Sequence, residues 1–282
     1  MHPATLSLPV AMLSLHCAAN SPTDLASLLR NRQLALNVKG VGGHSGECVN
    51  VSVHNLRSDS LTVRIPAGWR FVSQDSTLQD LLVVEDEVLA LAPKAAGTLT
   101  CRAFCCEASM GGPDEGSAFT AGSMAAEPLQ KLARFVNTER FPDGAVQQAV
   151  WAVSDGHDLS GIASDTDEST RRLREFVSTL TGRPIPWYTT TYAAPAEGRV
   201  FNPTPQHLTG RVEFTQKHAG ILSIVVKDAR GNTVYVLDEG RDLRQGFYKI
   251  QVEVTVHGWE KGRYAICFAT DGVLLKKQEF EL

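Results

Sequence analysis

Residues 220–237 read GILSIVVKDARGNTVYVL, two apolar runs on either side of a polar turn. β-Branched and aromatic residues fill much of both runs, which is typical of strands. The turn, residues 228–232, combines Asp, Gly and Asn, residue types that accept the backbone conformations of a tight reversal. This stretch therefore predicts a strand–turn–strand unit at the centre of a β-domain.

Similar apolar runs lie on both sides of this unit. They cover residues 210–215, 247–256, 263–270 and 273–280. Asp271-Gly272 joins the last two runs, and an Asp-Gly pair in this position is the strongest short-range signal for a hairpin. About six or seven short strands in a stretch of this length predict an immunoglobulin-like β-sandwich. We place this domain at residues 207–282.

The C-terminal domain also contains a definite order of short motifs. These are IVVKDARGNTV at 224–234, KGRYAI at 261–266, Asp271-Gly272, and LKK at 275–277. The order resembles the C-terminal sorting domains of the type IX secretion system. Its longer central stretch, residues 238–257, is similar to the immunoglobulin-like domain of flagellar-hook capping proteins. The resemblance implies an extracellular bacterial β-domain that sorts, anchors or spaces the rest of the chain.

A proline-rich stretch, residues 184–206, precedes this domain and is expected to be an extended linker. It carries three aromatic residues, Trp187, Tyr188 and Tyr192. Such rings can stack on a sugar ligand, or they can fill the junction between two modules. Both interpretations remain open at this point.

The first module, residues 23–183, changes its pattern near its middle. Short alternating runs between residues 34 and 119 predict antiparallel strands, and hence a β-sandwich. From residue 127 to residue 180 the apolar spacing becomes helical, which predicts about three helices. Their apolar stripes are Leu129, Leu132, Phe135 and Val136; Val146, Ala149, Val150 and Val153; and Leu173, Phe176, Val177 and Leu180. The fold class is therefore mainly β with a helical subdomain, followed by the second sandwich.

One pair of motifs in the first module carries potential chemistry. FCCE at 104–107 ends a predicted strand, and QQAVW at 147–151 lies in a predicted helix. The pair resembles the thioester domains of surface adhesins. That resemblance implies a bond between Cys105 or Cys106 and Gln147, with Trp151 one helical turn further on. A thiolate would attack the Gln carboxamide and expel ammonia, and the resulting acyl-sulfur bond would capture an amine.

The same residues have simpler interpretations. Alternation along the strand places Cys101, Ala103 and Cys105 on one face, with Arg102, Phe104 and Cys106 on the other. Val146, Ala149 and Val150 would then be an ordinary core stripe, with Trp151 at its edge and Gln147 solvated. The sequence is also compatible with a disulfide among Cys48, Cys101 and Cys106, or with a nucleophilic pair of Cys105 and His157.

Composition narrows the range of partners. Of the 282 residues, 43% are hydrophobic and 21% are charged, and the net charge is -4. This is a globular composition without a basic field, so we expect no nucleic acid partner. We expect no membrane-spanning helix, metal or cofactor; the acidic stretches 155–158 and 165–168 do not have the spacing of a calcium loop. Residues 1–22 are expected to be a signal remnant or a tail.

These observations favour a non-enzymatic protein located outside the cell or on its surface. In this hypothesis the first module binds a protein or glycan ligand, as an adhesin does, and the C-terminal module exports, anchors or spaces it. The alternative is a covalent-capture domain that uses Cys105 or Cys106 with Gln147.

Overall fold

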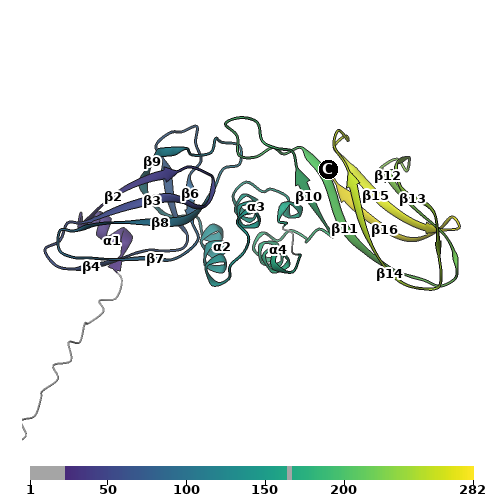
Figure 1. The fold of residues 1–282 in the computed structure, drawn as a ribbon, viewed down its shortest axis with the longest axis horizontal. Coiled ribbons are helices and arrows are strands. Elements are labelled where there is room, and N and C mark those ends of the chain that lie inside the picture. The colour runs from purple at the N-terminus through teal and green to yellow at the C-terminus, as the bar shows by residue number, and fades with distance from the viewer. Residues whose placement is uncertain (1–22, 164–166) are drawn as a thin grey trace, which may run out of the picture.

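The computed structural model describes residues 23–163 and 167–282; the predictions for residues 1–22 and for Asp165 lie outside these ranges. Three parts follow one another along the long axis: a β-barrel, a group of helices and a β-sandwich (Figure 1). The prediction of a mainly β chain with a helical subdomain is confirmed.

The predicted strands of the first module close into a barrel. Its order is β2 (Leu34–Val41), β3 (Ser45–Asn55), β8 (Ala96–Cys105), β6 (Leu81–Val83), β5 (Trp69–Ser73) and β9 (Glu115–Met124), which returns to β2. A second sheet contains β1 (Thr23–Asp24), β4 (Leu61–Ile65) and β7 (Glu87–Leu91). Helix α1 (Leu25–Arg30) packs beside this sheet. The expected sandwich thus takes the form of a closed ring with a small sheet attached.

Alternating burial explains why these residues form strands around one core. On β3, the side chains of Val49, Val51 and Val53 are fully buried and share one face. The ring can bend at β9 because of a glycine. Gly122 has a φ of +65°, and a Cβ there would lie 1.8 Å from the carbonyl oxygen of Arg70. Only glycine permits this close approach of β9 to β5.

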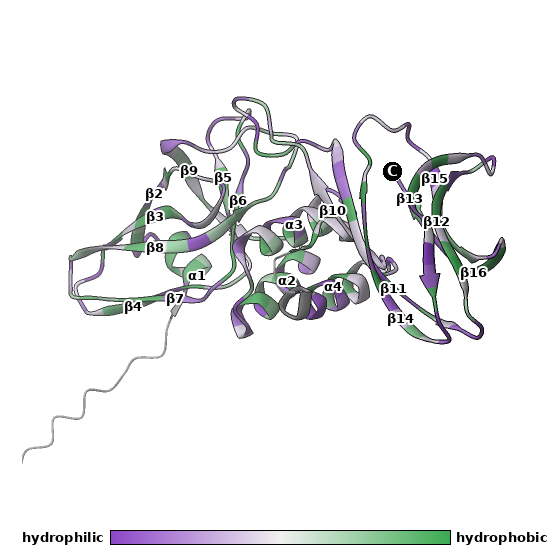
Figure 2. Cartoon of the chain, turned by 45° about the vertical axis from the view of Figure 1, so that its right-hand side comes forward, coloured by the Kyte–Doolittle hydropathy of each residue, from purple (hydrophilic) through white to green (hydrophobic). Residues whose placement is uncertain are grey.

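The helical subdomain consists of α2 (Glu127–Thr138), α3 (Asp143–Ser154), the short 3₁₀ helix η1 (Leu159–Gly161) and α4 (Asp167–Thr181). All three predicted helices are present. Helix α3 packs against β8 on one side and against α2 and α4 on the others. Hydrophobic residues occur in both the helices and the barrel strands (green in Figure 2). The apolar stripe predicted for this helix therefore covers only part of its buried surface. Its small residues, Ala145, Ala149 and Ala152, let neighbours approach from several directions, and all three are buried.

The C-terminal part is a two-sheet sandwich, in agreement with the immunoglobulin-like prediction. One sheet contains β10 (Tyr188–Tyr192), β11 (Pro205–Gln216) and β14 (Gly246–Thr255). The other contains β13 (Thr233–Leu243), β12 (Gly220–Asp228), β15 (Arg263–Thr270) and β16 (Val273–Glu281). Leu222, Ile224 and Val226 of the β12–β13 hairpin belong to the core between the sheets.

The stretch expected to be a linker contains one of these strands. Residues 188–192 form β10, which pairs antiparallel with β11, and Tyr188 and Thr190 are buried. The sequence YTTTY is rich in β-branched and aromatic residues, so it has strand propensity of its own. The prolines around it obscured that signal.

Candidate functional site

The junction between the barrel and α3 brings together the residues singled out from the sequence. The carboxamide of Gln147 faces the end of β8. Its Nε2 donates to the carbonyl of Cys105 at 2.8 Å, and the backbone N–H of Cys105 donates to Oε1 at 3.1 Å. Gln147 is only 2% exposed, so the expectation of a solvated side chain is wrong. The Gln147 carboxamide is paired with both the backbone N–H and the backbone carbonyl of Cys105.

The two neighbouring thiols point in opposite directions, as the alternation along β8 predicts. Cys105 belongs to the barrel core together with Cys101 and Ala103. Cys106 belongs to the core of the helical subdomain together with Phe104. Burial raises the pKa of both Cys105 and Cys106, which disfavours the reactive thiolate.

The hypothesis of a disulfide among Cys48, Cys101 and Cys106 is wrong, because every cysteine in the described part of the chain is a free thiol. For a bond to Cys106, the physical reason is the direction of the side chains. The Cys48 thiol contacts the carbonyl of Ala103 at 3.2 Å inside the barrel, whereas Cys106 lies on the helical side of β8. Burial raises the pKa of Cys48 and Cys101 to about 12.

Trp151 anchors the junction from its centre. It is 2% exposed and joins the barrel core, so its expected place at the edge of a helical stripe is wrong. Its Nε1 donates to Oε1 of Gln79 at 3.3 Å, and the same oxygen accepts from the backbone N–H of Glu107 at 2.9 Å. Gln79 was not foreseen from the sequence because it lies in an irregular loop with no motif. Its burial, at 0% exposure, marks it as part of the site.

A cluster of charged side chains lies on the barrel side of this junction. Arg70 donates to Asp80 at 2.8 Å and also to Glu107, while the carboxylate of Glu107 accepts the backbone N–H of Asp80 at 2.8 Å. Burial raises the pKa of the Glu107 carboxyl. The turn after β8 is therefore held by side chains from the barrel and from α3.

His157, considered above as a nucleophilic partner of Cys105, packs against aromatic rings. His157 packs its ring against Phe201, at 4.5 Å between centroids, and against Trp151, at 5.8 Å. Burial lowers the pKa of His157. Its neighbours Asp155 and Asp158 accept hydrogen bonds from the backbone of Ala108 and Ser160. Within residues 23–163 and 167–282, no group of three or more potential metal ligands is found.

The three aromatic residues of the expected linker have different partners. The indole Nε1 of Trp187 donates to the carbonyl of Glu279 at 2.7 Å, which fixes the ring to β16. Tyr188 is buried in the sandwich core. Tyr192 packs against Phe201, with ring centroids 5.1 Å apart, and burial raises its pKa to about 12. Trp187 and Tyr188 also line one cleft beside β10, and Tyr192 lines another.

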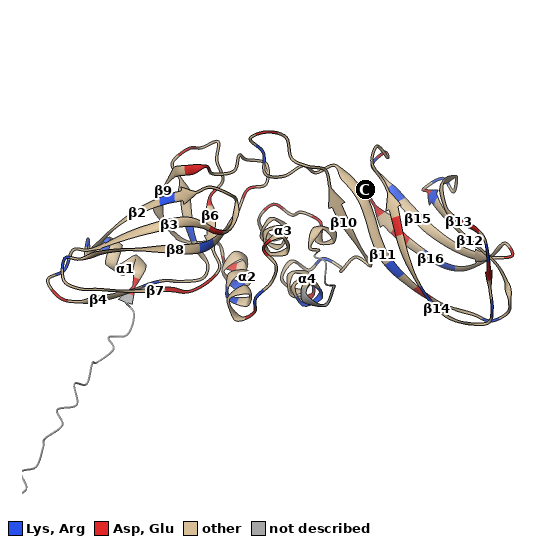
Figure 3. Cartoon of the chain, viewed as in Figure 1, with Lys and Arg blue, Asp and Glu red and all other residues tan. Residues whose placement is uncertain are grey.

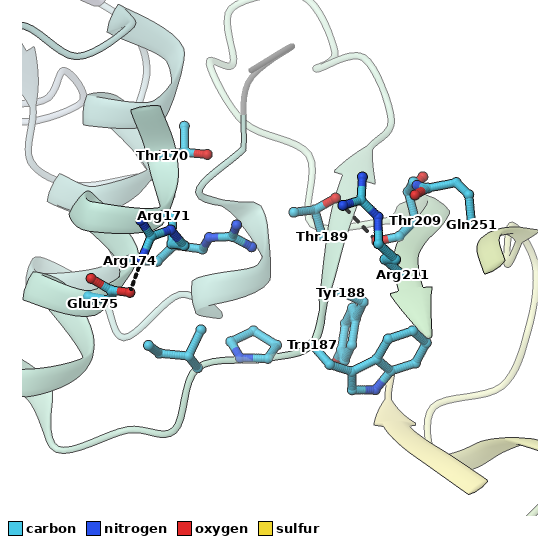
Figure 4. Close-up of a pocket in the computed structure, with 13 residues that line it drawn as sticks. Thr170, Arg171, Arg174, Glu175, Trp187, Tyr188, Thr189, Thr209, Arg211 and Gln251 are labelled. Atoms are coloured by element: carbon cyan, nitrogen blue, oxygen red, sulfur yellow. Dashed lines mark hydrogen bonds and ion pairs between the residues drawn. The ribbon is translucent and has the colours of Figure 1, made fainter. Parts of the chain in front are cut away.

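Two clefts flank β10 where the helical subdomain meets the sandwich. The first has a volume of about 500 Å³ and lies between α4 and strands β10 and β11 (Figure 4). The second, of about 650 Å³, lies on the other side and includes Tyr192 and Trp259. The hydroxyl of Ser160 donates to that of Thr190 at 2.9 Å and joins η1 to β10 between them. The two modules thus build these clefts jointly.

The first cleft contains charged residues that sequence reasoning missed. Arg171, Arg174 and Arg211 line it together with the carboxylate of Glu175. Charges of both signs occur in all three parts of the molecule (Figure 3), so neither composition nor local charge runs single out this place. Arg174 and Arg211 are far apart in sequence, and only the docking of the sandwich beside α4 brings them to one cleft.

The chain matches no family model, and no curated protein matches it. None of the helices in the described ranges combines the length and the apolar character that crossing a membrane requires.

Proposed function

We propose that this chain is a secreted or cell-surface interaction protein. In this proposal the barrel–helix module and its seam with the sandwich contact a protein or glycan ligand, as in an adhesin. The C-terminal sandwich exports, anchors or spaces that module. The observation that carries the proposal is the cleft of about 500 Å³ between α4 and β10–β11, to which both modules contribute. Clefts at domain interfaces are common positions for ligand sites.

The chemistry of the barrel–helix junction does not favour a cysteine nucleophile. Cys105 and Cys106 are buried thiols whose pKa values are raised, and Gln147 has its carboxamide engaged by the backbone. A nucleophilic thiol normally has a lowered pKa and an adjacent base. His157 instead packs against Phe201 and Trp151.

The location and the binding function are tested together with the full chain. Cells that produce the protein are treated with trypsin while they remain intact, with an internal protein as the control. We expect the chain to be cleaved and the internal protein to survive. The purified chain is then added to intact cells or extracellular matrix, where we expect saturable binding. A chain that is protected from trypsin in intact cells would contradict the proposed location.

One specific observation favours a second candidate, the covalent-capture domain. The carboxamide of Gln147 lies at the backbone of Cys105, one of the two cysteines that the thioester resemblance names. Intact mass of the denatured chain separates the two candidates. Acyl-sulfur formation lowers the mass by about 17 Da, the mass of the ammonia lost, and methylamine then adds to Gln147. We expect a mass that equals the sequence mass, with no methylamine adduct.

A further inference from the structure

The second cleft lies where the sandwich meets η1. Helix η1 supplies Ser160 to its lining, β10 supplies Thr190 and Tyr192, and the turn between β14 and β15 supplies Trp259. The volume of about 650 Å³ is in the range of small-ligand sites. A ligand in this cleft would contact both modules at once.

Two buried hydroxyl groups belong to the lining of this cleft. Ser160 and Thr190 are only 2% and 6% exposed, and the Ser160 hydroxyl donates to that of Thr190 at 2.9 Å. The Thr190 oxygen therefore accepts one hydrogen bond, whereas the Thr190 proton has no acceptor among the described residues. An unused donor in a buried position costs free energy. An oxygen atom of a ligand in the cleft would supply the acceptor.

A carboxylate lies beside these hydroxyls. Oδ1 of Asp158 accepts the backbone N–H of Ser160 at 2.7 Å, which places the side chain at the start of η1. Oδ2 of Asp158 accepts from no residue in the described ranges, and Asp158 lines the cleft. Burial raises the pKa of Tyr192 to about 12, and the negative charge of Asp158 nearby adds to this rise. The cleft thus places a hydrogen-bond acceptor next to groups that both donate and accept.

The lining also includes an aromatic ring held by its neighbours. Trp259 is partly buried and packs against Tyr264, with ring centroids 5.1 Å apart, and against Tyr235, at 6.1 Å. Val256 and Pro205 add aliphatic surface to the same lining. Such surfaces bury apolar groups, among them the C–H face of a sugar ring.

The charges of the lining disfavour an acidic ligand. Asp158 and Glu281 are negative and Lys261 is positive, and none of the three forms a salt bridge with another described residue. Carboxylates repel an anion that approaches them. A ligand rich in hydroxyls fits this lining better, because hydroxyls donate to a carboxylate and also accept from another hydroxyl.

We propose that this cleft binds a neutral oligosaccharide. Trp259 packs against the face of one sugar ring, Asp158 accepts from sugar hydroxyls, and Thr190 donates to one of them. This inference rests on the proposed function and names the ligand class of that function. It places the ligand on the η1 side of β10.

Titration calorimetry of the full chain tests this assignment. The neutral probes are maltotriose, cellotriose, mannotriose and triacetylchitotriose; the comparison probes are trigalacturonate, an acidic sugar, and a hexaproline peptide. We expect saturable binding of at least one neutral trisaccharide. Its affinity should barely change as NaCl is raised, because the ligand carries no charge to be screened. Trigalacturonate and hexaproline should bind at least about tenfold more weakly.

A variant of Asp158 tests the polar side of the cleft. Asp158→Asn keeps an oxygen for the N–H of Ser160 but removes the carboxylate, and we expect it to weaken sugar binding by about tenfold. Asp242→Asn is the matched control, since it makes the same change at an exposed position outside the lining. It should leave the affinity unchanged.

A variant of Trp259 tests the aromatic side. Trp259→Ala should weaken sugar binding by about tenfold or more, because the ring that packs on the sugar is lost. Phe247→Ala, at a ring that is 60% exposed on the same sandwich, is its control. The thermal midpoint of each variant is measured, since Trp259 also packs against Tyr264. Asp158→Asn decides the question if Trp259→Ala does not fold.

Several results would overturn the assignment. These are the absence of binding by every neutral trisaccharide, an equal effect of Asp158→Asn and Asp242→Asn, or tighter binding of trigalacturonate or hexaproline. Failure of the neutral sugars while the chain still binds intact cells would refute the ligand class and leave the proposed function standing. A chain shielded from trypsin in intact cells would instead count against the proposed function itself.

Discussion

The side chain of Gln147 pairs with the backbone of Cys105 in both directions, with its Nε2 donating at 2.8 Å and its Oε1 accepting at 3.1 Å. A carboxamide can do this because it carries the same donor and acceptor as a peptide group. Gln147 therefore continues the hydrogen bonding of β8 at the point where the strand ends. Helix α3 is joined to the barrel by this pair, which lies between the barrel core and the helical core.

The first prediction concerns this pair. We expect Gln147→Ala to lower the free energy of unfolding by about 1–3 kcal/mol, because it removes the side-chain partner of a buried carbonyl. The N–H of Cys105 keeps a second acceptor, the carbonyl of His44 at 3.1 Å, which limits the loss. Urea denaturation followed by circular dichroism measures the change.

Gln148→Ala is the matched control, since Gln148 is the same residue type on the same helix and only partly buried. We expect its effect to stay within about 0.5 kcal/mol, as for most partly exposed positions. Equal losses for the two variants would show that the pairing between Gln147 and Cys105 does not contribute specifically.

The sequence left two places open for Gln147, beside Cys105 or Cys106 or in solvent, and the structure has it at the backbone of Cys105. Alternation along β8 placed Cys105 and Cys106 on their correct faces. The burial of Gln147 was missed because an apolar stripe leaves a glutamine outside it, whereas α3 is enclosed on several sides. Local spacing cannot reveal such enclosure, since the neighbours come from β8, α2 and α4.

The cleft between the helical subdomain and the sandwich could be predicted even less, because it depends on long-range packing. The hairpin at 220–237 has its strand signals within a few residues, so its prediction needed no distant information. The cleft, in contrast, requires β10 to pair with β11 and the sandwich to dock beside α4. Arg174 and Arg211 line one cleft only as a consequence of both events. No sequence pattern within either segment indicates that the two arginines are close in the fold.

The second prediction concerns the reactivity of the thiols. In the folded chain we expect Cys267 to react with iodoacetamide well before Cys105 or Cys106. Cys267 is partly exposed, whereas the other two are buried with raised pKa values. Peptide mass spectrometry after brief labelling locates the adduct, and labelling in urea gives the reference for full access. Rapid modification of Cys105 or Cys106 before unfolding would contradict this picture of the junction.

The third prediction is a loss of stability at mildly acidic pH. Burial lowers the pKa of His157 and of His44 below their usual 6.5. The unfolded chain therefore binds protons more readily than the folded chain below that pH. The stabilising contribution of the neutral rings is complete above pH 6.5 and is lost as pH falls through the lowered values. We expect the free energy of unfolding to decrease between about pH 7.5 and about pH 5.5.

A comparison with His157→Gln isolates this effect from that of the other groups. Around His157 the described charged groups are Asp155, which favours its protonation, and Arg183, which opposes it and donates to the His157 carbonyl at 2.6 Å. Glu107 has a raised pKa, so its protonation acts in the opposite sense at lower pH. The variant should lose less stability than the parent over the same range. An identical pH profile for both proteins would exclude His157 as a source of the dependence.

The fourth prediction concerns the hydrogen bond that joins the two modules. Ser160 of η1 donates to Thr190 of β10 at 2.9 Å, and both residues are buried, at 2% and 6% exposure. Thr190→Val keeps the shape and the β-branched character of the side chain but removes the acceptor. We expect it to lower the free energy of unfolding by about 1 kcal/mol and to speed amide hydrogen exchange along β10. Thr191→Val, at the exposed neighbouring position, serves as the control and should leave both quantities nearly unchanged. If the two variants exchanged at the same rate, the Ser160–Thr190 contact would not be what holds β10 against the helical subdomain.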